Sequence, residues 1–424
     1  MRKLSINSNK SGFLEDGKTF FWLADTIWSA FTNVREDEWS FYLKKRRQQG
    51  FNVLQIDALP QWDRCRSDIG IYPFETKDGV NFDFSKINEE YFEHAAKYCR
   101  IAAENGFHPA VVVLWSNFVP GTWASKIYPA GIMPKEFIRP YVERLCKALE
   151  GVEPIFIISG DTDFDTEETI EYYDEALKVV EEMAPDKLKG MHIKRGYDVI
   201  PDRFVDRIDF YLYQSGHNVN GQDMAWKLAE TFRTKYPKKP VINGEPCYEQ
   251  MGFSRNIYGR FDERDCRNAA WTSILAGASA GITYGAHGIW NWMKPDMPKN
   301  PVLGEGFDSA LPIYEALNFP GAWDFGMLKE ELEKLDAGEI TPAQELIDKD
   351  TDRIRAGKTQ KGDILIYVPN TTKLKLRTAL PDTSRVKAYD LAERRTAHLS
   401  FEVSGNETTI EMPVFTKDML YVIK

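Results

Sequence analysis

The stretch His108-Pro-Ala-Val-Val-Val-Leu-Trp115-Ser-Asn117 carries the clearest fold signal of the chain. Its apolar residues are continuous, which is typical of a strand that is buried on both faces of a parallel sheet. Seven further short apolar runs occur along the sequence, several of them equally continuous, so we count eight predicted strands. They are Thr19–Leu23, Phe51–Ile56, His108–Trp115, Pro154–Ser159, Leu188–Ile193, Ile208–Tyr213, Pro240–Asn243 and Gly281–Tyr284.

Segments with helical spacing alternate with these runs, and each ends near a Gly or Pro, the usual helix stop. They are Asp37–Gln49, Asn88–Glu104, Pro134–Leu149, Thr166–Met183, Met224–Lys235 and Glu263–Ala276. The first and last strands lie roughly 270 residues apart, close to the size of a (β/α)8 barrel. The sequence therefore predicts an α/β fold with a TIM barrel over residues 1–335. A doubly wound sheet is the alternative, but no GxGxxG or GxxxxGK[ST] phosphate loop occurs.

The character of the sequence changes from about Arg353. Short runs that resemble strands follow, with turn residues between them; they are Ile364–Val368, Val386–Tyr389, Thr408–Met412 and Met419–Ile423. This pattern predicts a small antiparallel, β-sandwich-like domain over residues 336–424.

Charge and composition exclude several classes of protein. Lys and Arg number 54 against 64 Asp and Glu, a net charge of −10, so neither a nucleic acid nor an anionic membrane is the expected partner. No apolar run is long enough to cross a bilayer, and residues 1–7 contain no apolar segment of a signal peptide. Five cysteines without a CxxC pair favour a reduced protein. We therefore expect a cytoplasmic location.

The catalytic residues of such barrels lie at the carboxyl ends of the strands. These ends are rich in acidic, aromatic and amide side chains, as expected for a carbohydrate pocket. Asp161 follows the fourth run, and Asp165 is the predicted cap of the next helix, which leaves Asp161 available for catalysis. Glu245 is held between a strand end and Pro246. We predict these two carboxylates as the catalytic pair. The predicted substrate-binding residues are Asp25, Trp28, Asp57, Trp115, His192, Gln214, Tyr248, Tyr284, His287 and Trp290.

Other chemistries fit the sequence less well. The histidines at strand ends form no HxH or HExxH motif, so neither a metal nor another cofactor is predicted. The Asp161-x-Asp163-x-Asp165 spacing resembles a calcium loop, but Thr166 stands where the EF-hand needs Gly. Lys194 raises the alternative of a Schiff-base lyase. Asp163 is the second candidate for the general acid.

Several blocks, in order, resemble one family across most of residues 18–295. They are Phe21-Trp-Leu-Ala-Asp25-Thr-Ile-Trp28, Gly50-Phe-Asn-Val53, Ile158-Ser-Gly160-Asp161, Tyr213-Gln-Ser-Gly-His217, Asn243-Gly-Glu245-Pro-Cys-Tyr248-Glu249 and the segment from Ala276 to Trp290. The chain resembles the apiosidase-like glycoside hydrolases, barrels with a small C-terminal β domain. The resemblance implies a retaining glycosidase that releases terminal apiose from plant glycans or glycosides. It implies Asp161 as acid/base and Glu245 as nucleophile.

Two departures from that family refine the expectation. The absence of a signal segment favours a small imported glycoside or oligosaccharide as substrate, and the long loop after the eighth strand is expected to wall one end of the site. The segment Tyr389-Asp-Leu-Ala-Glu-Arg394 lacks the Pro-x-x-Gly turn expected in the β domain, which favours a packing role for that domain. An endo-acting glycanase and a non-catalytic sugar-binding protein remain the alternatives. The sequence does not specify an oligomeric state.

Overall fold

The computed structural model describes residues 2–61, 66–253, 257–295, 310–349, 351–380, 382–412 and 418–424. Eight parallel strands close into a barrel, which confirms the predicted fold. In chain order they are β4 (Trp22–Thr26), β5 (Val53–Asp57), β8 (His108–Trp115), β9 (Ile155–Gly160), β10 (Lys189–His192), β11 (Phe210–Gln214), β12 (Val241–Glu245) and β13 (Gly281–Tyr284).

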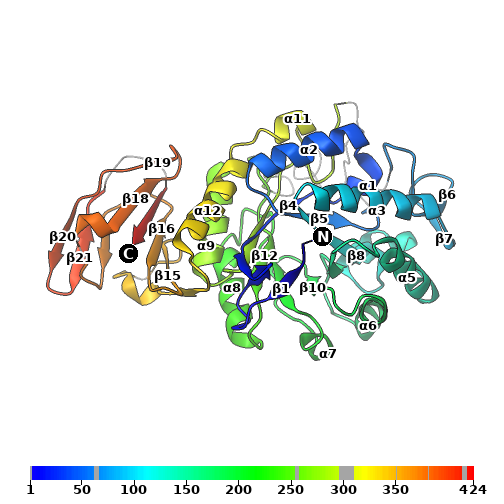
Figure 1. The fold of residues 1–424 in the computed structure, drawn as a ribbon, viewed down its shortest axis with the longest axis horizontal. Coiled ribbons are helices and arrows are strands. Elements are labelled where there is room, and N and C mark those ends of the chain that lie inside the picture. Colours follow the sequence, from blue (N-terminus) through cyan, green and yellow to red (C-terminus); the bar gives the residue numbers. More distant parts are fainter. Residues whose placement is uncertain are drawn as a thin grey trace.

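Helices surround the barrel (Figure 1). Those described are α1 (Ala30–Asn33), α2 (Glu36–Gln48), α3 (Glu89–Glu104), α4 (Trp123–Ile127), α5 (Ile138–Ala148), α6 (Glu167–Met183), α7 (Asp202–Val205), α8 (Met224–Lys235), α9 (Glu263–Leu275), α11 (Ile313–Ala316) and α12 (Gly321–Leu335). The predicted cap of α6 is wrong by one residue. The side chain of Thr166, not of Asp165, accepts a hydrogen bond from the backbone of Thr169 at 3.1 Å. A Thr hydroxyl does at this position what an Asp carboxylate would do.

A three-stranded sheet covers the amino-terminal end of the barrel. It contains β1 (Leu4–Ile6), β2 (Phe13–Glu15) and β3 (Lys18–Phe20). The ring of Phe13 lies 5.9 Å from that of Trp22 and 5.8 Å from that of Phe210, so this sheet closes the barrel with aromatic packing. The predicted run Thr19–Leu23 is therefore split between β3 and β4, because apolar residues continue across the bend between them. A hairpin of β6 (Phe74–Thr76) and β7 (Phe82–Ile87) lies between β5 and α3.

Two antiparallel sheets form the C-terminal part, as predicted. The first has the order β14 (Ile340–Pro342), β15 (Arg355–Thr359), β16 (Ile364–Val368), β22 (Met419–Ile423), β18 (Val386–Asp390) and β19 (Arg395–Thr396). The second has the order β17 (Leu374–Leu376), β21 (Glu407–Ile410) and β20 (Phe401–Ser404). A hydrophobic cluster that includes Ile366, Leu376 and Ile410 lies between them. Because α12 ends at Leu335 and β14 begins at Ile340, we propose the domain boundary between these residues.

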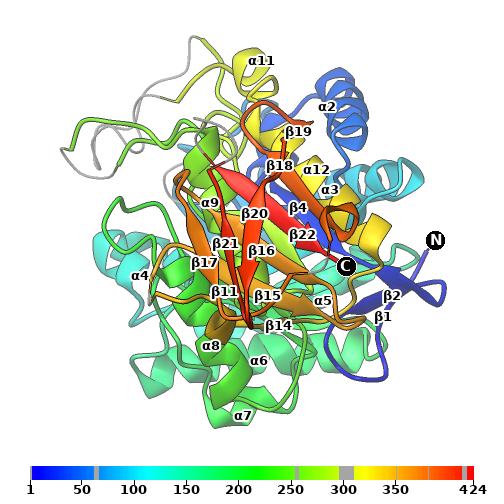
Figure 2. The same ribbon diagram turned by 90° about the vertical axis from the view of Figure 1, so that its left-hand side faces the viewer.

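The C-terminal sheets pack against the barrel through α9 and α12 (Figures 1 and 2). A buried charge network joins the two parts. Arg267 on α9 contacts Asp418 at 2.8 Å and Asp324 on α12 at 2.7 Å, and Tyr367 donates to Asp418 at 3.2 Å. Breaking a buried ion pair leaves an uncompensated charge, so this network couples the sheet to the barrel.

Two further properties concern the described residues. No helix among them is both long and apolar enough to cross a bilayer. Their cysteines, Cys99, Cys146, Cys247 and Cys266, are buried and unpaired.

Candidate active site

Glu245 reaches the barrel mouth because β12 carries an irregularity at its end. Asn243 pairs with Tyr213, but the next pair in the register joins Glu245 to Gln214, so Gly244 is an extra residue. Such a bulge changes the face to which the following side chain points. The carboxylate of Glu245 then faces inward and contacts residues that end β10 and follow β11.

Two histidines hold this carboxylate. His217 Nε2 lies 2.7 Å from Oε1 in a hydrogen bond, and His192 Nε2 lies 3.1 Å from Oε2 without hydrogen-bond alignment. Burial raises a carboxyl pKa, but the contacts with His192 and His217 outweigh it and hold the pKa of Glu245 below its ordinary range. Glu245 is therefore an ionised, buried carboxylate with one oxygen anchored and the other lacking an aligned donor among the described residues.

His192 connects Glu245 to the second predicted catalytic residue. Its Nδ1 accepts a hydrogen bond from the backbone N–H of Asp161 at 2.9 Å. A ring nitrogen that accepts carries no proton, so we assign a ring proton to Nε2, on the side of Glu245. The same imidazole thus touches the backbone of one predicted catalytic residue and the carboxylate of the other.

Asp161 lies directly after β9 and adopts an unusual backbone conformation. Its φ of +46° is in the left-handed region, which non-glycine residues rarely occupy. Its carbonyl accepts a hydrogen bond from Trp123 Nε1 at 2.7 Å, which ties the turn to α4. Residues held in such conformations cluster at functional sites, so this geometry favours a functional role for the turn.

The neighbouring Asp163 is already paired. It is fully buried, and its Oδ2 lies 2.7 Å from Nζ of Lys194. Because this carboxylate is fully buried and already engaged by Lys194, it is a less suitable general acid than Asp161. Because Nζ of Lys194 is engaged in the same ion pair, it is not free to attack a carbonyl carbon, which argues against a Schiff-base role.

Aromatic rings line the mouth beside Glu245. The rings of Trp28 and Trp115 lie 5.3 Å apart, and each lies 6.0 Å from the ring of His192. Trp28 Nε1 donates to Tyr248 Oη at 3.0 Å, and the Tyr248 ring lies 4.1 Å from that of His217. Burial, together with the charge of Glu245, raises the pKa of Tyr248 well above its ordinary range, so the phenol stays neutral. The structure thus brings these four predicted residues together around Glu245.

Four other predicted residues also end strands at this mouth. Gln214 is the register partner of Glu245, and its buried Oε1 has no hydrogen-bond donor among the described residues. Asp57 shares the inward face of β5 with Gln55, whose amide donates to the carbonyl of Gly244 inside the barrel at 3.0 Å.

His287 and Trp290 follow β13, with ring centroids 6.4 Å apart. Burial lowers the pKa of His287 to about 3, so this imidazole is neutral. Binding of substrate by Asp57, Gln214, His287 and Trp290 stays a prediction.

For Asp25 and Tyr284, the structure contradicts the prediction that they bind substrate. They are register partners on β4 and β13, and both side chains point away from the barrel axis. Asp25 is fully buried against α2, with Tyr42 Oη at 2.7 Å and Arg46 Nε at 2.6 Å. Tyr284 donates to Glu249 Oε2 at 2.6 Å. These contacts give both residues a structural role in the barrel wall.

His217 contacts Glu245 but is absent from the residues that the sequence predicts for the site. It follows the sixth predicted strand, Ile208–Tyr213, and no local motif links it to Glu245. The contact between His217 and Glu245 could have been inferred from the parallel register, which places the ends of β11 and β12 side by side. Within the described ranges, no cluster of His, Cys, Asp or Glu has the arrangement of a metal site. The absence of a metal requirement stays a prediction.

Comparison with known proteins then decides the family. The model of the apiosidase-like catalytic domain matches residues 8–339. The chain belongs to this apiosidase-like family. It is therefore a glycoside hydrolase with a barrel fold and a C-terminal β domain. No functionally curated protein matches the sequence.

Solved structures support the same fold. A protein described as a glycoside hydrolase is 22% identical, with a TM-score of 0.80 and coverage of 100% of this chain and 97% of that one. A glycoside hydrolase family 5 structure from Bacteroides vulgatus ATCC 8482 is also 22% identical, with a TM-score of 0.82 and coverage of 100% and 93%. The similarity extends through the C-terminal sheets as well as the barrel.

Proposed function

We propose that this apiosidase-like hydrolase removes a terminal, apiose-like pentose from small glycosides or oligosaccharides with retention of anomeric configuration. The observation that carries the proposal is the state of Glu245. His217 anchors Oε1 at 2.7 Å, and the buried Oε2 has no aligned donor among the described residues. An ionised carboxylate with one available oxygen is suited to attack an anomeric carbon.

The proposed reaction has two steps. Asp161 protonates the leaving-group oxygen while Glu245 forms a covalent bond to the anomeric carbon, and the aglycone departs as an alcohol. Asp161 then takes a proton from water, which attacks the glycosyl-enzyme and releases the sugar and Glu245. Retaining enzymes of this kind hold their two carboxyl groups about 5–5.5 Å apart. What supports the choice of these two residues is that His192 contacts both the backbone N–H of Asp161 and the carboxylate of Glu245, so they are neighbours at the mouth.

The substrate part of the proposal rests on the family and on the aromatic wall. Indole and phenol rings stack on the apolar face of a sugar, and Trp28, Trp115 and Tyr248 lie close together beside the two histidines that contact Glu245. The loop expected to wall one end of the site lies mostly in residues 296–309, outside the described residues. Exo action and a cytoplasmic location are accordingly expectations from the sequence.

One experiment tests mechanism and sugar together. Aryl glycosides, including the apioside, are incubated with the enzyme, and proton NMR follows the anomer formed first. We expect the substrate's configuration in the product, and release of pentose from the apioside. With an activated aryl apioside, the Asp161→Asn variant should accumulate a pentosyl adduct that peptide mapping locates on Glu245. An inverted product, or an adduct elsewhere, would overturn the mechanism, and faster internal cleavage of a polymer would overturn exo action.

A further inference from the structure

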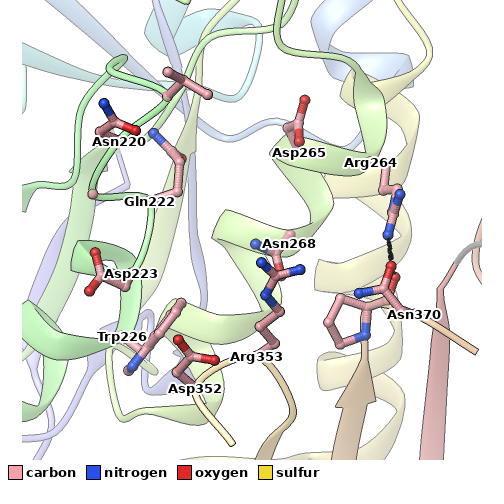
Figure 3. A pocket seen from close by; sticks show the side chains of 13 residues that line it. Asn220, Gln222, Asp223, Trp226, Arg264, Asp265, Asn268, Asp352, Arg353 and Asn370 are labelled. Atoms are coloured by element: carbon pink, nitrogen blue, oxygen red, sulfur yellow. Dashed lines mark hydrogen bonds between the residues drawn. The ribbon is translucent and has the colours of Figure 1, made fainter. Parts of the chain in front are cut away.

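A cavity of about 550 Å³ lies where the barrel meets the C-terminal sheets (Figure 3). The barrel supplies residues 219–223 of the loop between β11 and α8, and the first turns of α9. The C-terminal part supplies residues 352–353 and 369–370. This volume is within the range of small-molecule sites, about 300–1,000 Å³. None of the described residues that surround Glu245 lines the cavity, so it is separate from the candidate active site.

Several polar groups in this cavity have no protein partner. The guanidinium of Arg353 makes no hydrogen bond or ion pair with the described residues, and neither does the carboxylate of Asp352. The side-chain amides of Asn220 and Asn268 are unpaired in the same way. Figure 3 shows Arg353 between the α8 side of the cavity and the α9 side. These groups are therefore available to a ligand.

The other charged groups of the cavity are already engaged. Arg264 donates to the carbonyl of Pro369 at 2.8 Å and also contacts the side chain of Asn370, which holds the sheet against α9. Asp223 is paired with Lys227, and Asp265 belongs to the capping box of α9. Arg264 and Asp265 carry opposite charges and Asp223 is paired with Lys227, so together these groups add no net charge to the cavity.

The free groups define the chemistry of an occupant. One cation, one anion and two amides have no net charge, so they do not select a charged ligand. Hydroxyl groups donate to a carboxylate and accept from a guanidinium or an amide, and a polyhydroxylated neutral molecule satisfies all four groups together. In a glycoside hydrolase, the chemical class with these properties is a neutral sugar.

The cavity is also linked to the catalytic loop. Gln222 lines it, and its Nε2 donates to the carbonyls of Gly216 at 3.1 Å and Asn218 at 2.8 Å. These carbonyls belong to the residues on either side of His217, whose Nε2 anchors Glu245. An occupant that contacts residues 219–223 therefore contacts the loop that positions His217.

We propose that this junction cavity is a second carbohydrate site, which binds a neutral sugar unit and stabilises the loop that positions His217. The C-terminal sheets supply Asp352 and Arg353 to the site, which gives this domain a role in binding glycan beyond packing. The binding part of the proposal stands independently of the catalytic roles. Only its link to turnover rests on the proposed function of Glu245.

Hydrogen–deuterium exchange of the full-length Glu245→Gln chain tests the binding part, because this variant is not expected to hydrolyse a probe. The probes are cellobiose, xylobiose and arabinobiose at millimolar concentration, with digalacturonate as an acidic comparison. We expect a neutral disaccharide to protect residues 219–223, 264–268 and 352–353. Arg353→Ala and Asn268→Ala should each weaken binding about tenfold. Arg385→Ala, which removes an exposed arginine of the same domain outside the cavity, should leave binding unchanged.

Protection limited to the barrel mouth, or protection by digalacturonate alone, would overturn the proposal. So would equal affinity in the cavity variants and the Arg385→Ala control. The link to turnover is read separately in the otherwise wild-type enzyme. Gln222→Ala should move the acid limb of the kcat/KM profile to higher pH by loosening His217, and an unchanged limb would overturn this link. Because protection is measured without turnover, a wrong catalytic assignment leaves the binding result intact.

Discussion

Glu245 and Glu249 are two buried carboxylates only four residues apart, yet their surroundings shift their pKa values in opposite directions. At the mouth, burial of Glu245 is outweighed by His192 and His217, and its pKa is low. Outside the barrel, Glu249 accepts from Tyr284 at 2.6 Å and from the backbone N–H of Gly321 at 2.9 Å. Burial dominates there and raises the pKa of Glu249 to about 7.

The comparison shows what burial alone does to a carboxyl group and what specific donors add. Glu249 receives only neutral donors, although Gly321 begins α12 and a helix N-terminus favours an anion. Glu245 accepts a hydrogen bond from His217 and contacts His192, and its low pKa keeps it ionised at neutral pH. Two carboxyl groups with opposite shifts take different roles, here the proposed nucleophile and a structural anchor of α12.

The largest expected effect comes from neutralising the two carboxylates separately. Glu245→Gln should lower kcat by at least about 10⁴-fold, as when the nucleophile of a catalytic unit is removed. Glu249→Gln is the matched control, because Gln can still accept from Tyr284 and Gly321. Its kcat should stay near wild type. Steady-state kinetics on an aryl glycoside measures both, and comparable losses would remove the functional distinction between the two residues.

Asp161→Asn should cost about 10²–10⁴-fold in kcat/KM on a substrate with a poor leaving group, which depends on protonation. The loss should shrink with an activated leaving group, because the departing oxygen then needs less protonation. A series of aryl glycosides of graded leaving-group pKa measures this effect as the slope of log kcat/KM against leaving-group pKa. Asp163→Asn serves as comparison, since the carboxylate of Asp163 is already engaged by Lys194. A slope that steepens only in Asp163→Asn would transfer the acid role to Asp163.

His217→Phe should shift the pKa of Glu245 upwards, in the direction in which burial shifts the pKa of Glu249. The substitution keeps a ring against Tyr248 but removes the hydrogen bond to Oε1. Hydrogen bonds to charged groups contribute about 1.5–3 kcal/mol, which corresponds to a loss of about 10–100-fold in kcat/KM. The pKa of Glu245 should rise, and the acid limb of kcat/KM should move to higher pH. A smaller kcat/KM with an unmoved acid limb would contradict this role of His217.

Much of the barrel is predictable from the sequence because its strands are short apolar runs between amphipathic helices. The predicted limits of β8 and β13 agree with the structure. The predicted limits of the first strand are wrong because Phe20, Phe21 and Trp22 are apolar through the bend from β3 to β4. Hydrophobicity alone does not mark a chain reversal inside a buried segment.

The site is less predictable than the fold, because the direction of a side chain depends on strand parity. A strand buried on both faces lacks an alternating pattern, so Asp25 and Asp57 look equivalent in the sequence. The structure places Asp25 against Arg46 on α2, whereas Asp57 shares the inward face of Gln55. Glu245 lies inward only because Gly244 interrupts the register. The contact between His217 and Glu245 depends on the same register.

The smallest expected effect is on the free energy of unfolding, and it tests Glu249 separately from Glu245. Its folded pKa of about 7 exceeds the ordinary value of 4.5, so between these values the folded protein binds more protons than the unfolded chain. The free energy of unfolding then falls as pH rises through this window. The contribution of Glu249 is fully present below about pH 4.5 and is lost as pH rises through about 7. Its size is on the order of 1–3 kcal/mol.

Glu249→Gln removes this titration while it keeps a neutral acceptor for Tyr284 and Gly321. Thermal unfolding of both proteins between pH 5 and 8 should therefore show a difference that grows with pH and favours the variant at the alkaline end. Subtraction of the two curves cancels the titration of Glu245, whose depressed pKa acts in the opposite sense. Parallel curves for the two proteins would mean that Glu249 is ionised throughout the range. Both carboxylates would then be ionised over this range, so the contrast between Glu245 and Glu249 would rest on geometry alone and not on their charge.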